Sequence, residues 1–391
     1  MNSKWNPRLP AWLTRNVLML GLVALFTDMA TEMAMPLLPA FMASLGAGAM
    51  ALGLVEGAAD FTAAILKFYS GRLSDISGKR RPWVLAGYFL SSVARPFLGA
   101  AAAAWQVVAI RMTDRTGKGL RTSARDAMLA DSVHPDQHGA AFGFHQSLDH
   151  LGAVIGPLIA VALLLWAGLS LRPIFWLTAI PGVIAVSVIW FGVVEVAGKT
   201  EGKKVPGRPP KELLAFLIPV GLFSLGASSD LFLLKKAGSE GMPIWGMPLL
   251  WVALHLVKSS SSVIGGMLSD RIGPRPVITL GWLYYALIYG LFAFATTPPQ
   301  IIGLFIAYGL YYGLTESPEK AMVARLAGAA QRGSAFGWYH LVVGVLSLPA
   351  SLLFGLLWDH YGSQAAFLCG AGFALLGLAF LWAMPAVKKN A

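Results

Sequence analysis

The chain has 391 residues, of which 56% are hydrophobic and only 13% are charged, and its mean hydropathy is +0.64. Soluble proteins carry about 25% charged residues, so this composition excludes an ordinary soluble protein. The net charge of +11 does not indicate a nucleic-acid partner, because the sequence offers no soluble domain to carry a basic face. A single cysteine, Cys369, rules out a disulfide framework.

Apolar runs of about 20 residues, each able to cross about 30 Å of hydrocarbon, repeat along the chain. They predict an all-α membrane protein with twelve transmembrane helices, over residues 15–44, 48–69, 82–102, 104–126, 139–166, 172–195, 212–237, 247–268, 275–296, 299–322, 334–357 and 363–385. The first run contains Asp28 and Glu32 and lacks a small-residue cleavage site, so we interpret it as a retained helix and not as a signal peptide.

Basic residues gather in every second loop between these runs. The intervening loops, such as 44–50 and 296–300, are short and nearly uncharged. The positive-inside rule then predicts a multi-pass membrane protein with both termini in the cytoplasm.

Two pairs of carboxylates lie in the first two runs. Asp28 and Glu32 are one helical turn apart, and so are Glu56 and Asp60, so each pair shares a helix face. Carboxylates inside a membrane need a basic partner, water or a proton.

The loop after the second run reads GRLSDISGKRR over residues 71–81. A basic loop that merely obeys the topology rule would explain its Lys and Arg residues but not the spacing of Gly71, Asp75 and Gly78. Glycine permits close contact between helices, and an aspartate can cap or pair with a helix end.

The fourth run, 104–126, carries a charged stripe. At 100° per residue, six charged side chains fall within an arc of about 120°: Arg111, Asp114, Arg115, Lys118, Arg121 and Arg125. Lipid cannot solvate such a stripe, so it must face a polar interior, where it forms a pathway or a binding surface. Counting about 1.5 Å per residue from Trp105 places Arg115 near the midplane.

The fifth run, 139–166, combines polar and small residues. His145 and Asp149 are one turn apart; they are polar residues lining an inner cavity or, as an alternative, transition-metal ligands. Gly152, Gly156 and Pro157 favour close packing and a bend of the helix.

The chain repeats itself. QHGAAFG at 137–143 matches QRGSAFG at 331–337, and GRLSD at 71–75 matches GMLSD at 266–270, at offsets of 194 and 195 positions. A polar, proline-containing stretch lies between the halves. We therefore predict a six-helix bundle at 1–197, a cytoplasmic linker at 198–211 and a second six-helix bundle at 212–391, which is the parallel-repeat arrangement of transporters.

These motifs resemble the major facilitator superfamily, and the likeness covers nearly the whole chain. Residues 71–81 and their second copy look like the superfamily's cytoplasmic gate motif, although Ile76 and Pro274 occupy positions where basic residues are usual. The resemblance implies a gate built from Gly71, Asp75, Gly78, Arg80, Asp270 and Arg271.

Two further likenesses point to a subgroup. Gly143, Gly152, Gly156 and Pro157 match the fifth-helix motif of exporters that work by antiport, with Ala160 in place of a later glycine. Arg115 and Gly119 match a fourth-helix motif that is linked to proton coupling, but Arg111, Lys118, Arg121 and Arg125 are additions. The phrase DRTGKGLR at 114–121 resembles a large bacterial permease subgroup related to drug and solute exporters.

We therefore expect a secondary active transporter of the bacterial inner (plasma) membrane. It is expected to work by alternating access and to export a small organic solute, anionic or amphipathic, in exchange for protons. The substrate-binding residues are expected to be Arg111, Arg115, Lys118, Glu56, His145 and Asp149. Proton coupling is assigned to Asp28, Glu32, Asp60 and Arg115, although a structural ion-pair network could equally occupy these carboxylates. Gly152, Gly156 and Pro157 are added to the gate.

Other interpretations remain open. The basic stripe would suit a proton-coupled importer of an organic phosphate or carboxylate, and Asp28, Glu32, Glu56, His145 and Asp149 would suit a divalent-metal exporter. A membrane enzyme or sensor is disfavoured, because no phosphate loop, nucleophile constellation or output domain is evident. We expect neither a cofactor nor a bound metal. The expected partners are a small-molecule substrate, protons and the lipid bilayer, and the protein is expected to be a monomer.

Overall fold

The computed structural model describes residues 10–46, 49–196, 209–242 and 246–384, and in these residues it is built from helices without a strand. The α-helices, in chain order, are α1 (Arg15–Ala34), α2 (Leu38–Ser44), α3 (Ala49–Ser77), α4 (Arg81–Ala94), α5 (Ala104–Asp131), α6 (His138–Leu165), α7 (Leu171–Leu177), α8 (Ala179–Gly192), α9 (Lys211–Gly226), α10 (Leu231–Ser239), α11 (Gly246–Ile272), α12 (Pro274–Phe294), α13 (Pro298–Leu326) and α14 (Arg332–Ala383). Short 3₁₀ turns extend α1 at Met35–Leu37 and α4 at Arg95–Ala100.

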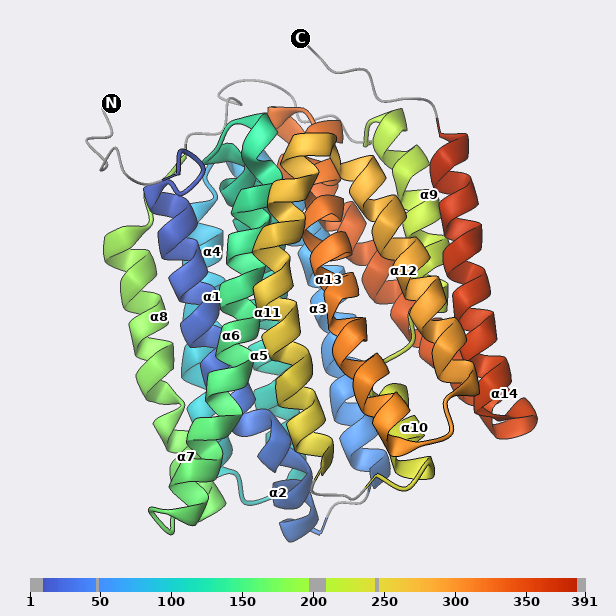
Figure 1. Cartoon of the computed structure of the whole chain (residues 1–391). Helices are drawn as coiled ribbons and strands as arrows, with labels where there is room; N and C mark the ends of the chain where they lie inside the picture. Colours follow the sequence, from blue (N-terminus) through green and yellow to red (C-terminus); the bar gives the residue numbers. More distant parts are fainter. Residues whose placement is uncertain (1–9, 47–48, 197–208, 243–245, 385–391) are drawn as a thin grey trace.

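Within the described residues these elements form twelve spans in two bundles, α1–α8 and α9–α14 (Figure 1). Pairs of short helices, such as α7 with α8 and α9 with α10, make single spans. The long α14 makes the last two spans, because Gly362 interrupts it with φ 85° and ψ 169°. The predicted twelve-helix membrane fold is confirmed, whereas the predicted linker at 198–211 lies almost wholly outside the described residues.

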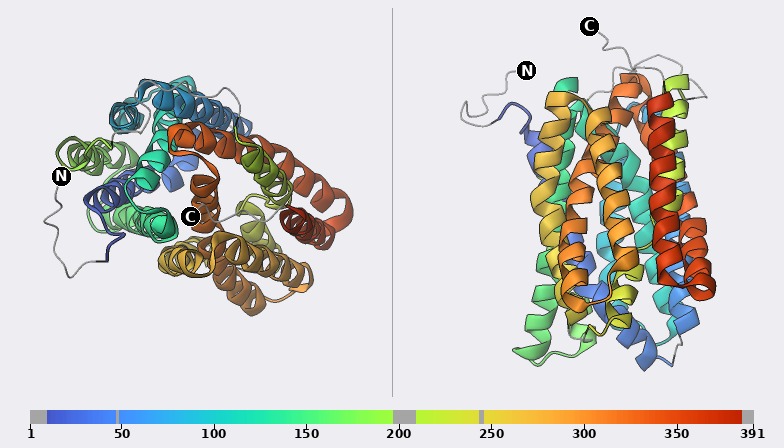
Figure 2. Two further views of the ribbon diagram at one scale, coloured as in Figure 1. Left: turned by 90° about the horizontal axis from the view of Figure 1, so that it is seen from above. Right: turned by 45° about the vertical axis from the view of Figure 1, so that its right-hand side comes forward.

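Seen along the helix axes, the two bundles lie beside one another (Figure 2). The start of α1 and the end of α14 lie at one end of the molecule, at the top of Figure 1. We call this the terminal end.

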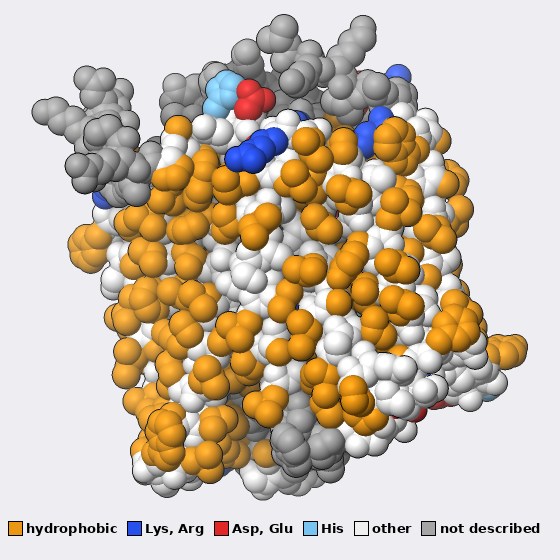
Figure 3. Space-filling view, in the orientation of Figure 1, with side chains coloured by type: hydrophobic (Ala, Val, Ile, Leu, Met, Phe, Trp, Pro, Cys, Tyr) orange, Lys and Arg blue, Asp and Glu red, His pale blue; other side chains and the backbone are white. Residues whose placement is uncertain are grey.

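The side of the molecule is apolar. Figure 3 shows hydrophobic side chains over most of one lateral face, with Lys, Arg, Asp and Glu near its upper and lower edges. By length and hydropathy, seven helical segments of the described residues could cross a membrane. The charged helix α5 is not among them, so its polar face depends on neighbouring helices for shelter from lipid.

The internal repeat is visible in the backbone. Gly78 separates α3 from α4 with φ +63°, and Gly273, 195 positions later, separates α11 from α12 with φ +91°. A side chain is strained at positive φ, so glycine is the residue that allows this tight turn in each half. Pro82 and Pro274 then occupy the first turn of the following helices, where no backbone donor is lost.

Helices in each bundle approach closely at small residues. A Cβ atom added to Gly87 of α4 would lie 2.5 Å from the carbonyl oxygen of Gly117 and 2.6 Å from Cβ of Arg121, both in α5. The contact therefore fixes the rotation of α5, and with it the direction of its charged stripe.

We expect Gly87→Ala to lower the thermal stability of the detergent-solubilised protein, because overpacking of this kind typically costs about 1–3 kcal/mol. Gly290→Ala in α12 is the matched control, since nothing lies within 4 Å of its added Cβ atom. Alanine at that helical site should leave the unfolding temperature unchanged or raise it. Equal unfolding temperatures for the two variants would contradict the close α4–α5 contact.

Candidate functional site

A cavity of about 360 Å³ lies among the helices, and both bundles contribute to its polar lining. The first bundle supplies most of the lining residues: Ala24, Thr27, Asp28, Thr31, Glu32, Met35, Lys67, Tyr88, Arg95, Asp114, Arg115, Lys118, Arg121, Thr122, Arg125, Gln146 and Asp149. The second bundle supplies Glu316 and Lys320 from α13 and His340 from α14.

The charged stripe of α5 faces this cavity. Five of its six members border it, and the exception is Arg111. Arg111 is 1% exposed, and its Nη1 lies 3.0 Å from Oδ2 of Asp114. The structure therefore places Arg111 behind the cavity wall and Arg115 and Lys118 on it.

Several of these charges are paired within the wall. Asp114 binds Arg95 as well as Arg111, with Nη2 of Arg95 2.8 Å from Oδ1. The guanidinium of Arg121 donates to Ser91 Oγ at 2.6 Å and lies 4.3 Å from the ring centre of Tyr88. Such pairing is what allows these charges to remain buried.

Asp28 and Glu32 border the cavity from α1, and α6 sets their position. Cβ atoms added to Gly152 and Gly156 would lie 3.1 Å from the Cβ atoms of Asp28 and Glu32, respectively. Gly152 and Gly156 thus pack α6 on α1 in the same bundle, one turn after another, with Pro157 inside the helix, and hold two carboxylates at the cavity. Gly143, at the start of the same motif, packs on α11 of the other bundle, where an added Cβ atom would lie 2.4 Å from the carbonyl oxygen of Ser262.

The other predicted side chains are distributed differently. Asp149 borders the cavity, but His145 is 1% exposed and is not among the lining residues. The side chains of Glu56 and Asp60 lie outside the described residues. Among the side chains that the structure describes, no group of three or more His, Cys, Asp or Glu is arranged to hold a metal ion.

Polar contacts cross between the bundles beside the cavity. Gln146 of α6 donates to Glu316 and accepts from Lys320 Nζ at 3.0 Å, both in α13. Asp126 of α5 lies 2.8 Å from Nε2 of His340 in α14 and also pairs with Arg125 at 2.8 Å.

Sequence reasoning did not assign these crossing residues to the site. The internal repeat could have indicated the residues of the second bundle. An offset of 195 positions relates Arg121 and Arg125 to Glu316 and Lys320, and His145 to His340.

At the terminal end, an aspartate of each bundle caps a helix of the other. Asp75, near the end of α3, accepts hydrogen bonds from the backbone N–H groups of Gly333 and Ser334 at 3.0 and 2.6 Å, at the start of α14. Asp270, near the end of α11, accepts from Gly139 and Ala140 at 2.8 and 2.7 Å, at the start of α6.

Neither helix start has a capping side chain of its own. Carboxylates are favoured at helix N-termini because they satisfy the free donors and oppose the helix dipole.

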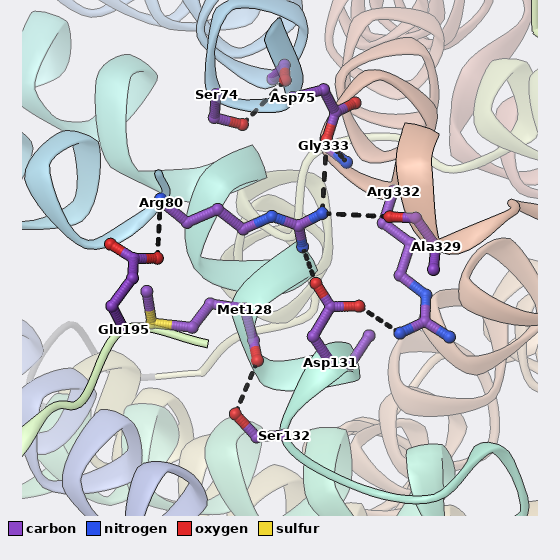
Figure 4. A network of polar contacts seen from close by, with 12 residues as sticks. Ser74, Asp75, Arg80, Met128, Asp131, Ser132, Glu195, Ala329, Arg332 and Gly333 are labelled. Carbon is purple, nitrogen blue, oxygen red and sulfur yellow. Dashed lines mark hydrogen bonds and ion pairs between the residues drawn. The ribbon is translucent and has the colours of Figure 1, made fainter. Parts of the chain in front are cut away.

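We call these two contacts between the bundles, at Asp75 and at Asp270, the seams. They are not equivalent. Arg80 lies 3.3 Å from Asp75 and 2.6 Å from Asp131, and Asp131 also binds Arg332 of the second bundle (Figure 4). In the second copy, the ion pair of Asp270 within the described part of the chain is longer, with Nη2 of Arg325 3.8 Å from Oδ1 of Asp270.

The remaining gate residues of the first copy are close to this network. Cβ on Gly71 would overlap the carbonyl group of Gly333, so this glycine permits backbone contact across the seam. Gly78 makes the turn described above. In the second copy, Arg271 is exposed.

Comparison with known proteins agrees with this architecture. The family model for the Major Facilitator Superfamily matches residues 20–256 and 213–391. The chain is 32% identical over 382 residues to an uncharacterized MFS-type transporter of Methanocaldococcus jannaschii, with 95% of each chain covered. This chain belongs to the major facilitator superfamily.

The chain is also similar to other transport and resistance proteins. The transporter is 23% identical over 386 residues to the multidrug resistance protein MdtG of Escherichia coli, with 94% of each chain covered. Among solved structures, the human organic anion transporter MFSD10 has a TM-score of 0.80 at 16% identity and covers 95% of this chain and 100% of its own. The E. coli fucose:proton symporter FucP has a TM-score of 0.71 at 15% identity, covering 97% and 100%. These structures support the fold.

Two carboxylates of the cavity should respond differently to neutralisation. We expect Asp114→Asn to destabilise the protein by about 3–5 kcal/mol, because it removes a carboxylate that pairs with the buried guanidinium groups of Arg95 and Arg111. Asp28→Asn should change stability by less than about 0.5 kcal/mol, since no hydrogen bond or ion pair joins Asp28 to another described residue. Thermal unfolding in detergent measures the stability of both variants. A larger loss of stability for Asp28→Asn than for Asp114→Asn would contradict the assignment of Asp114 as the structural counter-ion.

Proposed function

We propose that this transporter exports a small organic solute across the bacterial inner membrane in exchange for protons. One observation carries the proposal: a cavity lined by charged residues of both bundles lies inside a fold whose bundles are joined at the terminal end. The similarity to a protein named for multidrug resistance supports export, as does the glycine and proline pattern of α6.

In this proposal the terminal end faces the cytoplasm, as the distribution of basic loop residues favours. The bundles comprise residues 1–197 and 212–391, with a cytoplasmic linker at 198–211, and the protein works as a monomer. The contacts of Asp75 and Asp270 then represent a closed cytoplasmic gate, and alternating access requires both helix caps to separate.

Asp28 and Glu32 are the proposed proton carriers in the described residues, with Asp60 as a further candidate. Lys118 and Arg115 interact electrostatically with Glu32, and Lys118 also with Asp28. A carboxylate that faces a cavity beside cationic groups changes protonation state when those groups move. The gradient could thereby be coupled to the conformational change.

The cavity favours a polar solute over an amphipathic one. Its lining from the second bundle is Glu316, Lys320 and His340, without the tyrosines of α12 and α13. Tyr308 and Tyr312 instead donate hydrogen bonds to Asp230 at 2.8 Å, and Lys258 lies 3.0 Å from the same carboxylate. Tyr308 and Tyr312 therefore belong to a hydrogen-bond network around Asp230 within the second bundle.

The cytoplasmic gate can be tested with a single cysteine. In a Cys369→Ser background, Thr122→Cys places a thiol at the cavity, and a membrane-impermeant maleimide added to inverted vesicles reports access from the cytoplasmic side. We expect Asp75→Asn and Asp270→Asn to raise the labelling rate about tenfold, because a charge-assisted hydrogen bond contributes about 1.5–3 kcal/mol.

The control for the gate is Asp136→Asn. Asp136 is an exposed carboxylate near the same end of the molecule, and among the described residues its ion pair is with His134, which is also exposed. Its labelling rate should equal that of the parent. Equal rates in all four proteins would rule out a gate at these aspartates.

Proton coupling can be tested in inverted vesicles that hold a respiration-driven pH gradient. A compound exchanged for protons should dissipate part of the gradient, as reported by a pH-sensitive dye. For such a compound, Asp28→Asn should abolish the dissipation and leave the unfolding temperature intact, whereas Asp359→Asn, at an exposed ion pair with Lys235, should do neither. Unchanged proton flux in Asp28→Asn would eliminate this carboxylate as a carrier.

A proton-coupled importer of an anionic nutrient is the second candidate, favoured by the excess of cationic over acidic side chains around the cavity. The direction of net flux in proteoliposomes separates the two functions. With the interior acidic, an antiporter accumulates its substrate inside, whereas a symporter drives it out.

A further inference from the structure

The cavity has walls of opposite charge. The α5 wall carries Arg115 and Lys118, and the wall formed by α1 and α6 carries Asp28, Glu32 and Asp149. The close packing of α6 on α1 at its glycines brings these three carboxylates to one side. All three carboxylates border the same cavity, and we refer to Asp28, Glu32 and Asp149 together as the acidic surface.

The acidic surface differs from the other acidic groups around the cavity. Asp114 is bound by two arginines, and Glu316 is bound by Gln146 and by His150, whose Nε2 lies 3.3 Å away. By contrast, no hydrogen bond or ion pair joins Asp28, Glu32 or Asp149 to another residue that the structure describes.

A second polar group lies beside this surface, and it too has no hydrogen-bond partner in the part of the chain that the structure describes. Thr27 borders the cavity and is 4% exposed, and its hydroxyl has no hydrogen-bond partner among the described residues. Buried polar groups are normally satisfied, so an unsatisfied hydroxyl next to unbonded carboxylates indicates a position for donors supplied by a ligand. A protonated amine offers up to three N–H donors and a positive charge, as the ammonium of lysine does.

The α5 wall suits an anionic group. Arg115 and Lys118 present cationic side chains to the cavity, and a guanidinium can bind a carboxylate through two parallel hydrogen bonds. The volume of about 360 Å³ is near the lower end of the roughly 300–1,000 Å³ that ligand sites occupy. The site therefore fits a compact molecule with few apolar groups.

We propose that the transported solute is a small zwitterion, with its amine on the surface of Asp28, Glu32 and Asp149 and its acid group on the α5 wall. This inference rests on the proposed function, in which the cavity is the transport site. It narrows the substrate class from anionic or amphipathic solutes to molecules that carry both charges.

The test uses ω-amino acids of graded length, from glycine to 8-aminooctanoate, each compared with the acid that lacks the amine and the amine that lacks the acid. Binding to the purified full-length protein is followed by the shift in unfolding temperature. We expect at least one zwitterion to stabilise the protein in a concentration-dependent manner, with at least tenfold weaker binding of both of its analogues.

Matched variants locate the binding. Asp28→Asn combined with Glu32→Gln should weaken binding of the zwitterion at least tenfold, and Asp359→Asn should leave it unchanged. Equal binding of an acid or amine analogue would overturn the proposal, as would a series in which no zwitterion binds.

The same experiment separates this inference from proton-coupled export. If a monofunctional compound dissipates the pH gradient in vesicles and no zwitterion binds, export stands and the zwitterion proposal fails. If a zwitterion binds through the acidic surface but moves no protons, the site assignment stands and antiport fails.

Discussion

The structure depends on one constraint, that a charged side chain inside a hydrocarbon slab needs polar surroundings. Helix α5 carries more charge than lipid can tolerate, so its stripe faces inward and neighbouring helices must close around it. The contact between Gly87 and Gly117 sets the rotation that achieves this, and Arg95 neutralises Asp114 from the side. Five of the six charged side chains of the stripe border the cavity, where neighbouring helices shelter them from lipid.

Hydrogen bonds between aspartates and helix ends join the two bundles. Backbone donors at the starts of α6 and α14 are satisfied by aspartates of the opposite bundle, so each bundle completes the other's helix. The repeat supplies the aspartate twice, but only the first copy is reinforced by Arg80, Asp131 and Arg332. The sequence difference at Pro274, where a basic residue is usual, is consistent with this inequality.

Much of the fold could be predicted from the sequence, because hydropathy and the repeat act over long segments. The predicted run 82–102 corresponds to α4 and its 3₁₀ extension within two residues, whereas α3 continues to Ser77, eight residues beyond the predicted 48–69, since its last two turns are polar. Periodicity correctly indicated which face of α5 is polar. It could not indicate that Arg111 lies behind the wall, because that depends on Asp114 and on the packing of neighbouring helices.

The pairs across the bundles were also beyond sequence reasoning. Asp126 and His340 are 214 positions apart, and the local sequence around either residue does not indicate that the two are in contact. The glycines of α6 illustrate a different difficulty. Their spacing predicted a packing surface but not its partner. Gly152 and Gly156 pack on α1 beside Asp28 and Glu32, whereas Gly143 packs on α11 of the opposite bundle.

The reciprocal helix caps have a consequence for solvent. In the proposed transport cycle the seams separate, and the amide groups of Gly139, Ala140, Gly333 and Ser334 then lose their carboxylate acceptors together. A buried amide without an acceptor is costly. Water must therefore enter as the seams separate, which makes opening of the terminal end a wetting transition whose barrier includes the hydration of two helix ends.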